Sequence, residues 1–161
     1  MQQIFTIGYE GALAADLIGT LKIAGVTHLM DVREIAQSRR PGFSKNALSS
    51  ALAEAGIGYS HWRQLGDPKA GREAARAGRM DEFKTIFEAH LCKADTIAAL
   101  TEAANVIRSE ITVLLCYERE PRNCHRNLVA ERLSDLLSLP VRHLGVVENA
   151  GKQQHASAKA A

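Results

Sequence analysis

The chain has 161 residues, 46% of them hydrophobic and 24% charged, with a net charge of +2, which fits one compact domain with an ordinary core. We expect neither a secretory leader nor a membrane partner, because the first residues lack a basic start and no segment approaches the roughly 18 uninterrupted apolar residues of a span. The three cysteines form no disulfide-scaffold pattern and predict reduced thiols, so the expected location is cytoplasmic.

Short apolar and β-branched runs predict five strands, at residues 2–7, 28–32, 58–61, 111–117 and 141–145. The fourth run, ITVLLCY, is apolar on successive residues, which is typical of a central strand covered by helices on both faces. Strands that alternate with helices predict a single-domain, three-layer α/β/α fold with a mostly parallel five-stranded sheet. We assign this domain to residues 1–147 and a flexible tail to residues 148–161, which are small, polar and aperiodic.

Apolar residues at helical spacing predict the helices after the first two strands. The second of these helices is expected to begin at Ser44, a good N-cap, and to end at Gly56, where a left-handed residue is wanted. The inner stripe of the first helix comprises Leu13, Leu17, Leu21 and Ala24.

The second half of the chain begins with a polar, glycine-containing stretch at residues 63–79, which we interpret as a mobile flap. Two helices are predicted near residues 81–91 and 95–108, with Cys92 as apolar filler. The last helix is expected to follow an Asn123 cap. Its inner stripe comprises Leu128 or Val129, Leu133, Leu136 and Leu137.

The loop between the fourth strand and the last helix carries an unusual density of chemically active side chains. Cys124, His125 and Arg126 would occupy the first turn of the helix, where free N–H groups and the helix dipole favour an anion and an ionised thiol. We therefore predict a reactive thiolate at Cys124. The alternative is that Cys124 is buried filler, His125 is exposed and Arg126 pairs with Glu118 or Glu120.

Cys116 to Arg122 has the Cys-x5-Arg spacing of tyrosine phosphatases and some sulfurtransferase relatives. We interpret this spacing as coincidence, because the intervening YEREP is hostile to a phosphate cradle and its carboxylates would raise the pKa of the thiol. Metal binding by Cys116, Glu118, Cys124 and His125 is a further alternative. Cysteines eight residues apart argue against a structural zinc site, which leaves an open site completed by Asp31 or His61.

Three other loops should meet this one at the carboxyl edge of a parallel sheet. After the first strand, the glycines of GYEG indicate a tight turn or a close backbone approach. After the second strand, Asp31 and Arg33 either pair with each other or orient a ligand. Farther along this loop, Arg39 and Arg40 could grip an anion and Phe43 could offer a stacking surface. After the third strand, His61 supplies a titratable group and Trp62 a stacking platform.

The basic residues are concentrated in the middle of the chain, where residues 33–79 hold nine Lys and Arg against four Asp and Glu. Such a segment could provide a positive field for an anionic partner, although a solvated face with scattered arginines is the common alternative.

The motifs IGYEG, DVRxxxxSRRPGFS, YxHWRQLG and LLCYEREPxxCHR resemble the bacterial family known as domain of unknown function 488, over about residues 3 to 145. The resemblance implies no particular reaction. It implies that the recurrent positions of the family are Tyr9, Gly11, Asp31, Arg33, Ser38, Pro41, Phe43, Ser44, His61, Leu65, Gly66, Cys116, Glu118, Pro121, Cys124, His125 and Arg126.

These observations favour an enzyme, thiol-dependent or metal-assisted, that acts on an anionic small molecule such as a nucleotide or another phosphorylated compound. The expected catalytic residues are Cys116, Cys124, His125, Glu118, Asp31 and His61. The expected substrate-binding residues are Tyr9, Gly11, Arg33, Arg39, Phe43, Ser44 and Arg126. The sequence identifies no cofactor and no oligomeric state. A non-catalytic nucleic-acid-binding module and a redox module with a Cys116–Cys124 disulfide are the alternatives.

Overall fold

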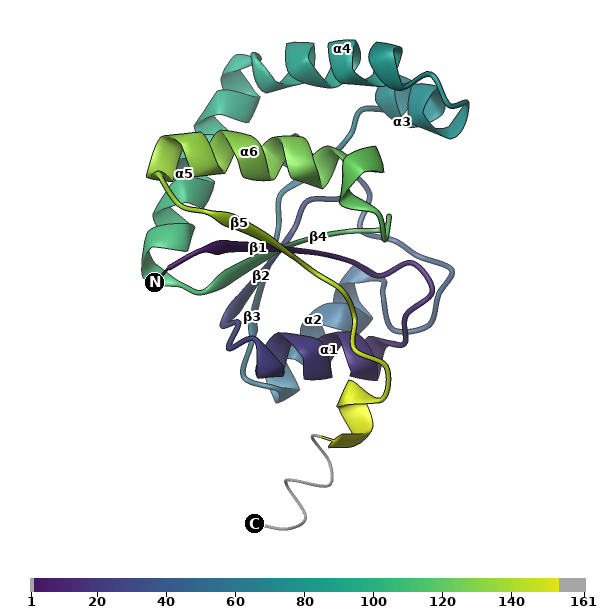
Figure 1. The fold of residues 1–161 in the computed structure, drawn as a ribbon, viewed down its shortest axis with the longest axis vertical. Coiled ribbons are helices and arrows are strands. Elements are labelled where there is room, and N and C mark those ends of the chain that lie inside the picture. The colour runs from purple at the N-terminus through teal and green to yellow at the C-terminus, as the bar shows by residue number, and fades with distance from the viewer. Residues whose placement is uncertain (1, 154–161) are drawn as a thin grey trace.

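Five parallel strands form one sheet, in the order β3-β2-β4-β1-β5, in the computed structural model, which describes residues 2–153 (Figure 1). The predicted α/β fold is confirmed, and the sheet is parallel throughout. The strands are β1 (Ile4–Gly8), β2 (His28–Asp31), β3 (Gly58–His61), β4 (Thr112–Cys116) and β5 (Val141–Leu144).

Helices cover both faces of the sheet, with α1 and α2 on one face and α4, α5 and α6 on the other (Figure 1). Strand residues alternate between the two cores, so that Leu115 faces α1 and α2 whereas Leu114 packs beneath α6. The helices are α1 (Ala14–Ile23), α2 (Lys45–Glu54), α3 (Lys69–Arg76), α4 (Met80–Leu91), α5 (Ala94–Ser109) and α6 (His125–Leu137), with 3-10 turns η1 (Arg63–Leu65) and η2 (Pro121–Asn123).

The predicted helices at 81–91 and 95–108 are confirmed as α4 and α5. The stretch at residues 63–79, interpreted as a flap, contains η1 and α3. Its helix was missed because it presents almost no apolar stripe: only Gly71 and Ala74 of α3 are buried.

Several individual assignments change. Leu13 and Leu136 are exposed, because Leu13 precedes α1 and Leu136 lies on the outer side of α6. Cys92 is exposed at the end of α4 and is not apolar filler. Ser44 does occupy the N-cap of α2, but its hydroxyl bonds the backbone of Ser38 rather than the helix.

The chain connections that leave β1 and β4, which are neighbours in the sheet, run in opposite directions across it. From β1 the chain passes through α1 towards β2, whereas from β4 it passes through α6, on the opposite face, towards β5. Open parallel sheets bind their ligands outside the carboxyl ends of strands at such a point. A ligand site is therefore expected next to Gly8 and Cys116, the last residues of these two strands.

The segment after β5 packs against α1. Ala150 is fully buried, and the N–H of Gly151 donates to Asp16 Oδ1 at 3.1 Å. Of the predicted tail at 148–161, residues 154–161 lie outside the described part of the chain. Among residues 2–153, no helix combines the length and apolarity that a membrane crossing requires.

Candidate functional site

A wide cleft lies at the carboxyl edge of the sheet, where the loops after β1, β2, β3 and β4 meet α3. Its volume is about 1770 Å³, whereas small-molecule sites usually enclose roughly 300–1,000 Å³. The cleft can therefore accept a large or extended ligand. Predicted site residues that line it are Tyr9, Arg33, Arg39, Ser44, His61, Cys116, Glu118 and His125.

The cleft is lined by six of the nine basic residues of the 33–79 segment. Two of them are already paired: Arg33 with Asp31, and Arg72 with Glu34 at 2.7 Å. The other four are exposed, and they are Arg39, Lys45, Arg63 and Arg76. The lining also includes the carboxylates of Glu34, Asp67 and Glu118.

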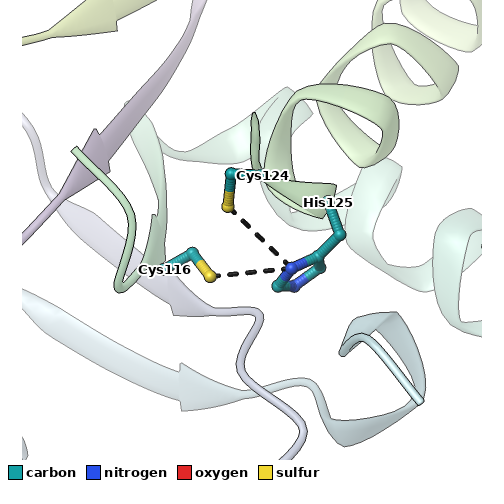
Figure 2. A group of neighbouring side chains, drawn as sticks. All are labelled: Cys116, Cys124 and His125. Atoms are coloured by element: carbon teal, nitrogen blue, oxygen red, sulfur yellow. Dashed lines mark hydrogen bonds between the residues drawn. The ribbon is translucent and has the colours of Figure 1, made fainter. Parts of the chain in front are cut away.

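Three predicted residues form a buried cluster at the edge of this cleft (Figure 2). His125 Nδ1 lies 3.6 Å from Cys116 Sγ and 3.9 Å from Cys124 Sγ, and the three atoms all lie within 4.8 Å of one another. They meet because Cys116 ends β4 on the same face as Leu114, the face that carries the start of α6. Cys116 and His125 line the cleft.

The imidazole of His125 is held in one orientation. Its Nε2 donates to the carbonyl oxygen of Val32 at 2.6 Å, because a carbonyl can only accept. The ring also meets the ring of Phe87 edge-on, at a centroid distance of 5.4 Å. The other nitrogen, Nδ1, therefore faces the two sulfur atoms, and the alternative of an exposed His125 is wrong, since the residue is buried.

Burial raises the pKa of both thiols. For Cys116 the carboxylate of Glu118, which accepts from Sγ at 3.1 Å, raises the pKa further, as the sequence predicted for the carboxylates of this loop. For Cys124 the pKa lies well above its ordinary value because of burial and the neighbouring Cys116. Desolvation therefore opposes the ionisation that the helix N-terminus was predicted to give Cys124.

The pKa of His125 is coupled to that of Cys124. Burial alone lowers the pKa of His125, but a thiolate at Cys124 and the Val32 carbonyl raise it, to about 9. A proton on His125 and a thiolate on Cys124 therefore stabilise each other, so the pair is either neutral or an ion pair.

The N-cap of α6 is Cys124, not Asn123, because the chain makes the 3-10 turn η2 before the helix begins. Cys124 Sγ accepts from the N–H of Arg126 at 3.5 Å, as the side chain of a cap residue does. His125 and Arg126 are consequently the first two residues of the helix.

Arg126 is fully buried and supports the loop after β4. Its guanidinium donates to the carbonyl oxygens of Glu118 and Arg119, so the predicted alternative of a pair with the Glu118 or Glu120 carboxylate does not form. The loop also rests on β1, because a Cβ built on Gly8 would lie 1.8 Å from the carbonyl oxygen of Glu118. The close backbone approach predicted for GYEG is confirmed at Gly8, and the tight turn at Gly11, whose φ is +75°.

On the opposite face of the sheet, Asp31 and Arg33 form a buried, bidentate ion pair, with bonds of 2.8 and 2.7 Å. Tyr59 donates its hydroxyl to Asp31 at 2.6 Å, and Arg33 also donates to Tyr9 and to the backbone of Phe43. The Asp31 carboxylate therefore already has hydrogen-bond partners within the protein. Of the two roles predicted for Asp31 and Arg33, the structure has the pairing of these residues with each other. Burial and Asp31 raise the pKa of Tyr59.

The remaining predicted residues occupy different positions. Phe43 is fully buried and stacks on Tyr9 with a centroid distance of 4.4 Å, so its ring offers no surface to a ligand. Trp62 is partly buried against the core, with Nε1 donating to Ser60. His61 is half-buried and donates to the carbonyl oxygen of Arg33. Arg126 is enclosed, so it gives an anion no exposed contact.

Sequence reasoning missed Asp67, a buried carboxylate that lines the cleft. Its Oδ1 has no hydrogen-bond partner within the described residues, and a Cβ on Gly71 would lie 2.1 Å from that oxygen. Burial raises the pKa of Asp67 to about 6, against the opposing effects of His125 and Arg72. A carboxyl group that titrates near neutrality can donate or accept a proton during a reaction.

Comparison with known families matches residues 14–133 to the family described as "Domain of unknown function DUF488". Neither the curated proteins nor the solved structures provide a match.

Proposed function

The chain belongs to the DUF488 family, whose description assigns no activity, and we propose that the protein is an enzyme that acts on an anionic substrate bound in the cleft. One observation carries this proposal: buried ionisable side chains, Asp67 and the Cys116–His125 pair, line the same cleft as four exposed cationic side chains. Burying ionisable groups lowers stability, and such groups in clefts are characteristic of catalytic sites.

The exposed cations would bind the substrate. Arg39 and Lys45 lie on the β2–α2 side of the cleft, whereas Arg63 and Arg76 lie on the side of η1 and α3. Cations on two sides of a cleft suit a ligand with more than one negative charge, such as a phosphorylated compound.

Tyr117 favours a nucleotide within this class. It follows Cys116 directly, lines the cleft, is 46% exposed and meets Tyr9 edge-on. An exposed ring next to a cationic surface can stack on a base, the role that the sequence had suggested for Phe43 and Trp62.

Asp67 would transfer the proton. Its pKa of about 6 lies near neutral pH, where general acid–base catalysis is most efficient, and its Oδ1 has no partner among the described residues. The Cys116 thiol is protonated at neutral pH, so His125 or a metal ion must displace its proton before the sulfur can react.

The test is turnover of a panel of nucleotides and phosphorylated metabolites, followed by ³¹P NMR. We expect Asp67→Asn to slow the reaction at least about 100-fold, the usual contribution of a general acid or base. Asp135→Asn, an exposed change on α6, is the matched control and should leave the rate unchanged. Full turnover by Asp67→Asn, or no turnover of any compound by the wild type, would contradict the proposal.

A second candidate, nucleic-acid binding without chemistry, is favoured by the size of the cleft and the excess of basic side chains around it. Gel retardation of a single-stranded oligonucleotide over a salt series separates the two functions. Retention that weakens steeply with salt and is unaffected by Asp67→Asn supports the binding module. The substitution Lys45→Ala should weaken retention, whereas Arg108→Ala on α5 should not.

A further inference from the structure

We propose that Cys116, Cys124 and His125 bind a thiophilic divalent metal ion, with zinc as the expected ion. The proposal is separate from the proposed reaction, because a metal could be bound here even if the cleft turned over no substrate.

The spacing of the three ligand atoms supports a shared ion. With Zn–S bonds of about 2.3 Å and Zn–N bonds of about 2.0 Å, a tetrahedral zinc separates sulfur from nitrogen by about 3.5 Å. The distances from His125 Nδ1 to Cys116 Sγ and Cys124 Sγ are 3.6 and 3.9 Å, and no pair of the three atoms is farther apart than 4.8 Å. Only small movements would close this arrangement around an ion (Figure 2).

The chemistry of the donors also fits. His125 donates through Nε2 to Val32, the arrangement that ligating histidines usually adopt, so a neutral ring has its Nδ1 lone pair turned towards the sulfurs. Binding of Zn²⁺ would release the two thiol protons to solvent. The resulting site, with two thiolates, a neutral imidazole and the ion, carries no net charge, which suits a buried position.

Rigid elements hold each ligand. Cys116 is the last residue of β4, Cys124 is the N-cap of α6 and His125 is the first residue of that helix. The N–H of Arg126 points at Cys124 Sγ, where it would stabilise a thiolate. The Phe87 ring fixes the plane of the imidazole. Supporting contacts of this kind are what a preorganised metal site requires.

The fourth coordination position would face the cleft. Cys116 and His125 line the cleft, whereas Cys124 is 2% exposed and closes the site from behind. Three protein ligands with one open position are typical of catalytic rather than structural zinc. Glu118, whose Oε2 lies 3.1 Å from Cys116 Sγ, borders this position.

Cobalt provides the test, because Co²⁺ bound by thiolates in tetrahedral geometry gives d–d bands and a sulfur-to-metal charge-transfer band. Chelator-treated protein, kept reduced, would be titrated with Co²⁺ and then with Zn²⁺ in competition. We expect one ion per chain in the wild type and in Cys92→Ser, which changes the exposed cysteine. Cys116→Ser and Cys124→Ser should each bind more than about 100-fold more weakly, since loss of supporting partners alone costs about 10- to 100-fold.

The Cys124→Ser variant should remain folded, because serine is itself a good N-cap. Its far-UV circular dichroism spectrum should therefore match that of the wild type. The proposal is overturned if the folded, reduced wild type shows no charge-transfer band, or if Cys92→Ser lowers affinity as much as Cys116→Ser. It is also overturned if gently purified protein carries no metal and intact mass reveals a Cys116–Cys124 disulfide. None of these readouts requires turnover, so failure here and failure of the proposed reaction can be distinguished.

Discussion

His125 and Val32 join the start of α6 to the residue that follows β2, through one hydrogen bond of 2.6 Å between the ring Nε2 and the backbone oxygen. This bond orients Nδ1 towards Cys116 and Cys124, and it fixes the backbone next to Arg33, whose own side chain is held by Asp31 on the opposite face of the sheet.

Two substitutions at His125 separate the structural role of this bond from metal binding. The amide of His125→Gln can still donate to Val32, whereas His125→Leu leaves that buried oxygen without a partner, so its free energy of unfolding should be lower by about 1–3 kcal/mol than that of His125→Gln. Both variants should lose the cobalt bands, because neither has an Nδ1 ligand. Urea unfolding measures the stabilities, and equal values for the two variants would refute the structural role of the bond.

The pKa of Asp67 predicts an unusual dependence of stability on pH. Because the pKa is raised in the folded state to about 6, the folded protein holds a proton that the unfolded chain has already released. The contribution of this proton to the free energy of unfolding is fully present below about pH 4, the ordinary pKa of an aspartate. It is lost as pH rises through about 6.

Asp67→Asn should remove this effect. Relative to the wild type, the variant should gain about 2 kcal/mol in its free energy of unfolding between about pH 4 and pH 7, after allowance for screening by solvent at the cleft. Denaturant unfolding at several pH values measures the difference between the two proteins, which cancels the carboxylates they share. A constant difference for Asp67→Asn would mean that Asp67 titrates normally.

The fold could be predicted from the sequence because strands and helices are indicated by apolar patterns within short segments of the chain. Apolar runs located all five strands, and apolar residues at helical spacing located α4, in which Phe83, Phe87 and Leu91 are buried. The helix α3 was missed because, with Gly71 and Ala74 as its buried residues, it lacks such a stripe.

The site could be predicted only in part, because its details depend on distant contacts. The loop after β4 was identified from its composition, and the eight-residue separation of Cys116 and Cys124 argued against a structural zinc site. That separation does not give the distance between the two sulfur atoms in the fold, since one residue ends a strand and the other caps the helix above the same face. Asp67 gave no signal, because its pKa depends on burial and on charges from other elements. Phe43 is buried by Tyr9, which lies far from it in the sequence.

Gly8 should be essential for the loop that carries the cluster. A Cβ at this position would collide with the backbone carbonyl of Glu118, which cannot move without displacing the loop. Gly8→Ala should therefore lower the free energy of unfolding by about 3 kcal/mol. Gly145→Ala, at an exposed glycine with no neighbouring atom within 4 Å, should change it by less than about 0.5 kcal/mol. Thermal or urea unfolding checks both, and a Gly8→Ala protein as stable as the wild type would mean that the loop is not tightly seated on β1.

Arg126 offers a test that separates its charge from its hydrogen bonds. Arg126→Lys keeps the charge but cannot reach both the Glu118 and Arg119 carbonyls, so it should lose about 2 kcal/mol of stability, whereas the exposed Arg122→Lys should lose almost none. The pKa of His143 is lowered by burial and then by the Arg126 charge. Arg126→Met should consequently raise the His143 pKa, whereas Arg126→Lys should leave that pKa unchanged. An NMR titration of His143 measures both. If both variants shift His143 equally, the shift reports a rearranged loop rather than a lost charge.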